Sequence, residues 1–235
     1  MFESAAQLMV GVIIVSVAFF ALDLWRLAAE AARAIGERHR RVAVGAGLVL
    51  CAWLGFALLA TTVGPLNDAI SSVPGLPQIL SLAAILALLS LGFAPAFRRA
   101  FDSVPMESVM TFFYWRAVFG ALLLAAYGAG RLPAGFGIPA GLGDMAVTML
   151  AILILALKPT PGEVPRAPVW LWNAAGLIDL ISVGFLAVTV LRPWAAARGL
   201  PTNFAMLNFV VPLFIAIHIH IFGRLWRAGR AKSIR

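Results

Sequence analysis

The apolar segments of the chain contain several residues of types that can bind ions or transfer protons, among them Arg116, Asp144, Asp179 and His218. Ionisable groups are costly inside a lipid bilayer, so each is a candidate functional residue. Arg116 and Asp179 lie about 12 Å and about 16 Å from the same predicted end of their segments, at 1.5 Å per residue. We therefore predict an Arg116–Asp179 ion pair between two helices. It is either part of a substrate or ion pathway or a structural pair that fixes helix register.

Glycines on the same helical faces, Gly120 and Gly176, would let the two helices approach closely. Polar and aromatic side chains elsewhere in the apolar segments are candidates for lining a pocket. For Trp53, simple helix packing is the alternative. The pocket candidates are Trp53, Tyr127, Trp172, Asn173 and Asn208.

Asp144 has two interpretations. It follows Pro139 and two glycines at the predicted start of a span, where a carboxylate caps free amides and meets the positive end of the helix dipole. Alternatively it forms an outer gate or cation site, with Arg131 or Thr148 as its partner.

His218 and His220 are two residues apart, so they point about 200° apart on a helix. They cannot bind one metal or one haem from the same helix. We expect one to be a polar anchor at the membrane interface, and the other to join Arg116 and Asp179 in a polar cluster. No metal and no cofactor is predicted. A haem shared across a dimer, or one with a methionine ligand, is the alternative.

The elements that position these residues follow from the composition. Hydrophobic residues make up 62% of the 235 residues and charged residues 12%, against about 45–50% and about 25% in soluble domains. We predict an all-α polytopic membrane bundle forming one domain over residues 1–235. Seven apolar runs approach the length that spans roughly 30 Å of hydrocarbon. They are Ala5–Trp25, Val42–Val63, Ile79–Phe97, Val109–Gly128, Leu142–Leu157, Val169–Leu191 and Phe204–Phe222. The fifth run is short, so we expect its span to begin earlier, in the Gly/Pro-rich stretch before it.

Basic residues orient the predicted bundle. Most of the 18 Lys and Arg follow the first, third, fifth and seventh runs, including those in a basic tail over residues 226–235. The positive-inside rule puts these segments in the cytoplasm, with the N-terminus outside. The net charge of +8 then indicates contact with anionic lipids, and no nucleic-acid-binding pattern is present. Trp25, Trp170, Trp172, Trp194 and Trp226 fall at predicted membrane boundaries.

Several activities are excluded. The two lysines, Lys158 and Lys232, lie outside the apolar runs, so no retinal Schiff base is expected. The sequence contains no G-x-S-x-G motif, no Walker A motif and no pair of thiols. The absence of a recognisable nucleophile or metal-ligand set favours a protein that is not an enzyme.

Three ordered motifs resemble those of a group of small bacterial multi-spanning inner-membrane proteins, over roughly Thr111–His218. The resemblance implies a bacterial inner-membrane protein and brings no activity with it. The motifs are Trp115-Arg116 with Gly120; Gly130-x-Leu132-Pro133-x-x-Phe136 leading to Ala140-Gly141-x-Gly143-Asp144; and Trp172-Asn173-x-x-Gly176-Leu177-x-Asp179.

The leading hypothesis is a small-solute or ion/proton transporter built around the buried Arg–Asp site. The first alternative is a structural or accessory subunit of a larger membrane complex. The sequence does not determine the oligomeric state, so a homo-oligomer is an equal alternative to a larger complex. The second alternative is a membrane-embedded enzyme acting on a lipid or quinone, or a haem carrier.

Overall fold

The computed structural model describes residues 2–34, 37–62, 75–159, 164–198 and 209–233, together with 65, 70, 72 and 73. All regular structure within these ranges is helical, which confirms the predicted all-α class. The helices are α1 (Phe2–Ala34), α2 (Glu37–Thr62), α4 (Leu76–Leu91), α5 (Pro95–Ser103), α6 (Met106–Phe112), α7 (Trp115–Gly128), α8 (Ala134–Ala156), α9 (Arg166–Leu186), the π-helical η1 (Ala187–Leu191), α10 (Arg192–Ala196) and α11 (Val211–Ser233).

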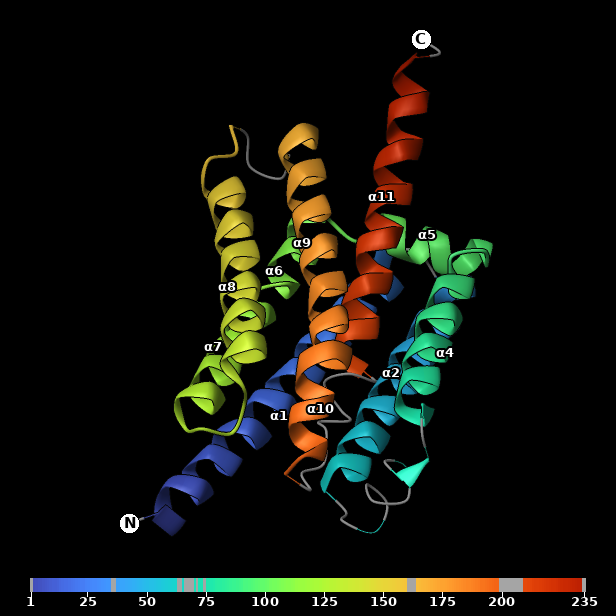
Figure 1. Ribbon diagram of the computed structural model, residues 1–235. Coiled ribbons are helices and arrows are strands. Elements are labelled where there is room, and N and C mark those ends of the chain that lie inside the picture. The colour runs from blue at the N-terminus through green and yellow to red at the C-terminus, as the bar shows by residue number, and fades with distance from the viewer. Residues whose placement is uncertain are drawn as a thin grey trace.

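The helices form a bundle in which sequence neighbours are mostly spatial neighbours (Figure 1). α7 packs on α8, α8 on α9, and α1 on α2. The last helix, α11, packs against both α9 and α4 and so joins the two halves of the bundle. α1 begins at one end of the bundle and α11 finishes at the other (Figure 1).

A cluster of phenylalanines forms the core where these halves meet. Phe20, Phe112, Phe113, Phe209 and Phe214 are each at most 1% exposed. Their rings pack mostly edge to face or tilted, at centroid separations of 5.0–6.4 Å. Such arrangements are favoured because the positive ring edge meets the negative ring face.

The third predicted span is broken. α4 ends at Leu91, and α5 begins at Pro95 after a turn and runs at 85° to the helix before it. Pro95 begins the second helix because proline fits the first turn of a helix but not its interior. The predicted boundary at Phe97 was wrong, since Phe97 lies on α5.

The fourth predicted span contains a tight turn beside Arg116. α6 ends at Phe112 and α7 begins at Trp115. The amides of Phe113, Tyr114, Arg116 and Ala117 each donate to the carbonyl three residues earlier, as in a 3₁₀ turn. The hydroxyl of Thr148 on α8 reaches the Phe113 carbonyl at 3.4 Å. The turn is therefore supported from α8.

The fifth span begins at Ala134, directly after Pro133, which confirms that it starts before Leu142 in the Gly/Pro-rich stretch. Its first half consists largely of small residues, and it meets α7 at very short range. A Cβ atom at Gly120 on α7 would lie 2.6 Å from the Gly141 carbonyl oxygen on α8. Only glycine fits there, so this contact fixes α7 against α8.

Among the described residues, three helical stretches are long and apolar enough to cross a membrane: Met106–Gly128, Ala134–Ala156 and Arg166–Ala196. The bent α4–α5 pair makes a fourth if it counts as one span. The predicted spans over Ala5–Trp25 and Phe204–Phe222 extend beyond the part of the chain described at side-chain level. The described part therefore supports three or four spans, and the total of seven stays a prediction.

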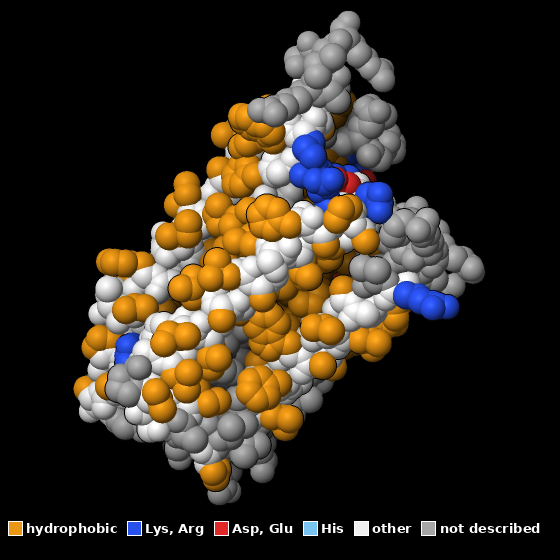
Figure 2. Space-filling model, turned by 90° about the vertical axis from the view of Figure 1, so that its right-hand side faces the viewer, with side chains coloured by type: hydrophobic (Ala, Val, Ile, Leu, Met, Phe, Trp, Pro, Cys, Tyr) orange, Lys and Arg blue, Asp and Glu red, His pale blue; other side chains and the backbone are white. Residues whose placement is uncertain are grey.

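The exterior matches a lipid environment. Figure 2 shows hydrophobic side chains over most of one face, with Lys and Arg gathered mainly toward the end where α11 finishes. Leu157 and Leu171 are each 72% exposed, and Phe93 is 87% exposed. Contiguous exposed apolar surface of this kind marks contact with lipid or with a protein partner.

Candidate functional site

The guanidinium of Arg116 is the centre of a polar cluster between α7, α8, α9 and α11. Its side chain is fully buried. Nε donates to Oδ1 of Asp144 at 2.6 Å, and Nη2 donates to Oδ2 of Asp179. Nη1 donates to the Gly176 carbonyl at 3.2 Å and lies 3.4 Å from Nε2 of His218. The predicted Arg116–Asp179 ion pair is present, and Asp144 and His218 belong to the same cluster.

His218 is held in one orientation by Asn173. The side-chain amide Nδ2 of Asn173 donates to the His218 carbonyl at 3.0 Å, so its Oδ1 is free to accept. Nδ1 of His218 lies 2.7 Å from that Oδ1 and must donate to it. This network assigns the proton to Nδ1 and leaves the lone pair of Nε2 facing Arg116. The imidazole is therefore neutral in this arrangement.

Aromatic rings close the cluster on the side of His218. The imidazole packs on Phe113 at a centroid separation of 4.5 Å and on Trp172 at 5.4 Å. Trp172 is fully buried and donates its indole N–H to the Val147 carbonyl at 3.2 Å. The prediction of Trp172 as a residue of the interfacial belt was wrong, because helix packing places it in the core. Its selection as a site-lining residue agrees with the geometry.

Two glycines leave space for side chains of the cluster. A Cβ atom at Gly143 would collide with the Asp179 carboxylate, and one at Gly176 would collide with the His218 imidazole. The sequence pattern assigned Gly120 and Gly176 to a direct approach of the fourth and sixth spans. Gly120 instead meets α8, and Gly176 makes room for a side chain from α11.

The capping interpretation of Asp144 was wrong. α8 begins at Ala134, well before Asp144, so no free helix amides remain for its carboxylate to cap. The partner of that carboxylate is Arg116, and not Arg131, which is exposed. Thr148 lies one turn further along and donates to the Asp144 backbone carbonyl at 2.9 Å. Helix–helix packing thus places Asp144 deep in the bundle.

The remaining predicted residues lie elsewhere. Trp53 packs edge-on against Phe209 at 5.8 Å, which is helix packing. Tyr127 is exposed, about three turns along α7 from Arg116. His220 faces away from the cluster and lies 3.2 Å from the Leu88 carbonyl, which confirms that the two histidines occupy different helix faces. Asn208 lies outside the described residues.

Sequence reasoning missed the backbone and aromatic members of the cluster. Neither the Gly176 carbonyl nor Phe113 carries a signal in the sequence, since both act through helix packing. Gly143 stands beside Asp144 in the motif, yet its contact with Asp179 depends on how α8 meets α9. The sequence does indicate that Gly176 lies beside Asn173, because their i, i+3 spacing places both residues on one helix face.

The charges of the cluster do not cancel. One guanidinium faces two carboxylates, and His218 is neutral, so the cluster carries a charge of −1 when both carboxylates are ionised. The side chains of Asp144 and Asp179 are 10% and 16% exposed, whereas that of Arg116 is buried completely. The carboxylates are therefore its accessible members. In the described part of the chain, no group of three or more His, Cys, Asp or Glu could hold a metal ion.

The fold and the cluster together define a helical protein with several helices long and apolar enough to span a membrane, which meet at a buried arginine–carboxylate site. The chain belongs to the family described as a domain of unknown function (DUF8737), which matches residues 73–226. All four residues of the ion-binding hypothesis lie within that range. No curated protein and no solved structure matches the chain.

Proposed function

We propose that this protein is an inner-membrane transporter that moves protons, alone or coupled to a small solute, through the cluster around Arg116. The observation that carries the proposal is the excess of one carboxylate over the guanidinium in a buried site. Unbalanced charge inside a membrane protein is costly, so its presence indicates a functional site. A proton on one carboxylate balances the cluster, and its release restores the negative charge.

Asp179 is the carboxylate that exchanges the proton in this proposal. It is the more exposed of the two, and its carboxylate packs directly against Gly143, where a Cβ atom would collide with it. Asp144 keeps the Nε hydrogen bond of Arg116 at 2.6 Å and so holds the guanidinium in place. The lone pair of His218 Nε2 accepts from the guanidinium on the opposite side. Arg116 is therefore fixed while the Asp179 carboxyl gains or loses a proton.

The proposed topology has seven spans, with the N-terminus outside and the C-terminus in the cytoplasm of a bacterial cell. The distribution of Lys and Arg supports this orientation. The start of α1 and the finish of α11 lie at opposite ends of the bundle, as an odd number of spans requires (Figure 1). Anionic lipids at the cytoplasmic basic segments are the proposed partners.

Proton flux into vesicles tests the proposal. The purified protein is reconstituted into vesicles that contain a pH-sensitive dye, and a potassium diffusion potential drives the flux. We expect flux above that of empty vesicles, and a loss of about a hundredfold in Asp179→Asn. Asp102→Asn is the matched control, because Asp102 pairs with Arg227 at the surface and should leave the flux unchanged.

Two results would overturn the proposal. The first is an Asp179→Asn variant with the flux of the wild type. The second is a folded wild-type protein with no flux above empty vesicles, either alone or with added solutes. The second result would favour the accessory-subunit hypothesis, and partner chains that co-purify from the membrane would then identify the complex.

A further inference from the structure

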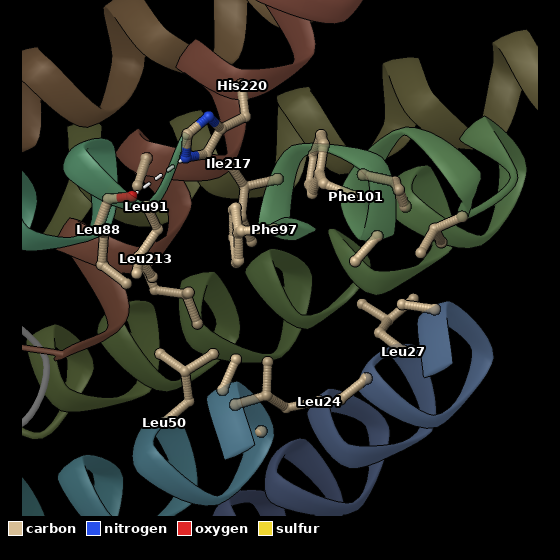
Figure 3. Close-up of a pocket in the computed structure, with 18 of the residues that line it drawn as sticks. Leu24, Leu27, Leu50, Leu88, Leu91, Phe97, Phe101, Leu213, Ile217 and His220 are labelled. Carbon is tan, nitrogen blue, oxygen red and sulfur yellow. Dashed lines mark hydrogen bonds between the residues drawn. The ribbon is translucent and has the colours of Figure 1, made fainter. Parts of the chain in front are cut away.

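A separate apolar pocket lies between α1, α2, α4, α5, α6 and α11, apart from the polar cluster (Figure 3). Its volume is about 120 Å³, and it is partly open to the exterior. Leu, Ala, Val, Ile, Phe and Gly line it, and His220 is its single polar lining residue. An apolar cavity of this kind stays dry and accepts hydrocarbon.

Residues of α6 and α11 stand between the pocket and the polar cluster. Phe112 lines the pocket, while the next residue, Phe113, packs against His218. On α11, Ile217 and His220 face the pocket, whereas His218 points to Arg116. The two sites are therefore on opposite faces of the same helix, and an occupant of the pocket does not touch the cluster.

α5 lies across one end of the pocket and is strongly amphipathic. Phe97, Ala100 and Phe101 line the pocket, and Figure 3 shows Phe97 and Phe101 on the helix beside it. Arg98 and Arg99, on the same short helix, are exposed. A helix with one apolar and one basic face lies in the plane of the membrane interface. The pocket consequently lies just below the level of lipid headgroups.

Further basic groups gather at this end of the pocket. Arg224 donates to the carbonyl of Val104, a pocket-lining residue, at 2.6 Å. Arg227 pairs with Asp102 at 2.8 Å. Four arginines on α5 and α11 thus lie at this end of the pocket, and their positive charge favours an anionic headgroup at this level.

We propose that the pocket binds one hydrocarbon chain of an anionic membrane phospholipid, whose headgroup phosphate lies among the arginines of α5 and α11. The apolar lining selects the hydrocarbon, and the arginines select the negative charge. Since the pocket is close in size to a cavity that accepts benzene, it takes a segment of one acyl chain, and the rest of the lipid lies along the protein surface. The proposal is independent of proton transport.

Native mass spectrometry tests the occupant. The full-length protein is released from nanodiscs that contain equal amounts of phosphatidylglycerol and phosphatidylcholine. We expect one phosphatidylglycerol to be retained per chain, and about tenfold less retention in Ala46→Phe, because the added ring fills the pocket. Ala83→Phe on the exposed face of α4 is the matched control and should retain the lipid of the wild type.

A second pair of measurements separates the headgroup from the chain. Arg98→Gln with Arg99→Gln should remove the preference for phosphatidylglycerol over phosphatidylcholine and leave total lipid retention measurable. Equal retention of both lipids by the wild type would overturn the anionic specificity. Retention in Ala46→Phe equal to that of Ala83→Phe would overturn the site itself.

Photo-crosslinking of the wild type covers the case in which Ala46→Phe does not fold. Phosphatidylglycerol with a diazirine on its acyl chain should label pocket residues on α1 and α2, such as Leu27 and Leu50. Labelling confined to exposed residues such as Leu82 on α4 would refute the proposal without any substitution.

Discussion

Replacing Arg116 by methionine removes the only positive charge of the buried cluster while keeping a long unbranched side chain. All three guanidinium nitrogens have partners in the structure: two carboxylates, the Gly176 carbonyl and His218. Methionine offers no donor to any of them. Asp144 and Asp179 would face each other across the site without a counter-charge.

The expected cost follows from that geometry. Removing one partner of a buried ion pair costs about 3–5 kcal/mol, because the remaining charge stays buried and unpaired. Two carboxylates share Arg116, so we expect the upper end of this range, about 5 kcal/mol. In a chain of this size, about 1 kcal/mol shifts the thermal midpoint by about 2–4 °C. Arg116→Met should therefore unfold about 10–20 °C below the wild type.

Reversible unfolding in mixed micelles, followed by tryptophan fluorescence at rising sodium dodecyl sulfate, measures the loss. Arg131→Met is the matched control, because Arg131 is exposed and the change should stay within about 0.5 kcal/mol. Adding Asp144→Asn and Asp179→Asn to Arg116→Met removes the unpaired charges. This triple variant should recover about 3 kcal/mol or more of the loss.

Either of two results would refute the electrostatic reasoning. One is an Arg116→Met variant as stable as Arg131→Met, which would mean that the guanidinium does not compensate the carboxylates. The other is a triple variant no more stable than Arg116→Met alone, which would mean that the loss comes from packing and not from unpaired charge.

Three further predictions concern the surroundings of the cluster and the protein surface. Gly176→Ala should cost about 1–3 kcal/mol in thermal unfolding, because the added methyl group collides with the His218 imidazole. Gly184→Ala on the same helix has open space around the added methyl group, so it should be neutral or stabilising by up to about 1 kcal/mol. Equal effects of these two alanines would contradict the close approach. Asn173→Leu should cost about 1–3 kcal/mol in the micelle assay, since it leaves the buried Nδ1 proton of His218 without an acceptor. A neutral effect would argue against the assigned network. Arg227→Ala should cost less than about 1 kcal/mol, because the Arg227–Asp102 ion pair is exposed to water, which screens it. A loss of stability as large as that of Arg116→Met would contradict the argument that burial makes the Arg116 ion pairs the more important ones.

The sequence by itself determined the helical class and the residues that carry charge into the bundle. Apolar runs of membrane-spanning length and the low charge content leave few alternatives to a membrane bundle, because a soluble domain cannot cover so much apolar surface. The Arg116–Asp179 pair followed from their similar depths in two spans that run in the same direction. The opposite directions of His218 and His220 followed from helical periodicity alone.

Tertiary packing decided the rest. Hydrophobicity patterns do not reveal where a helix breaks, so the turn at Phe113 required the structure. Asp144 looked like a cap because the start of its helix had been placed too late. Its pairing with Arg116 depends on the glycine contact between α7 and α8, which brings two backbones together at a distance that no local pattern encodes. The periodicity of a helix is determined by residues close together in the sequence, whereas contacts between helices depend on the packing of the whole bundle.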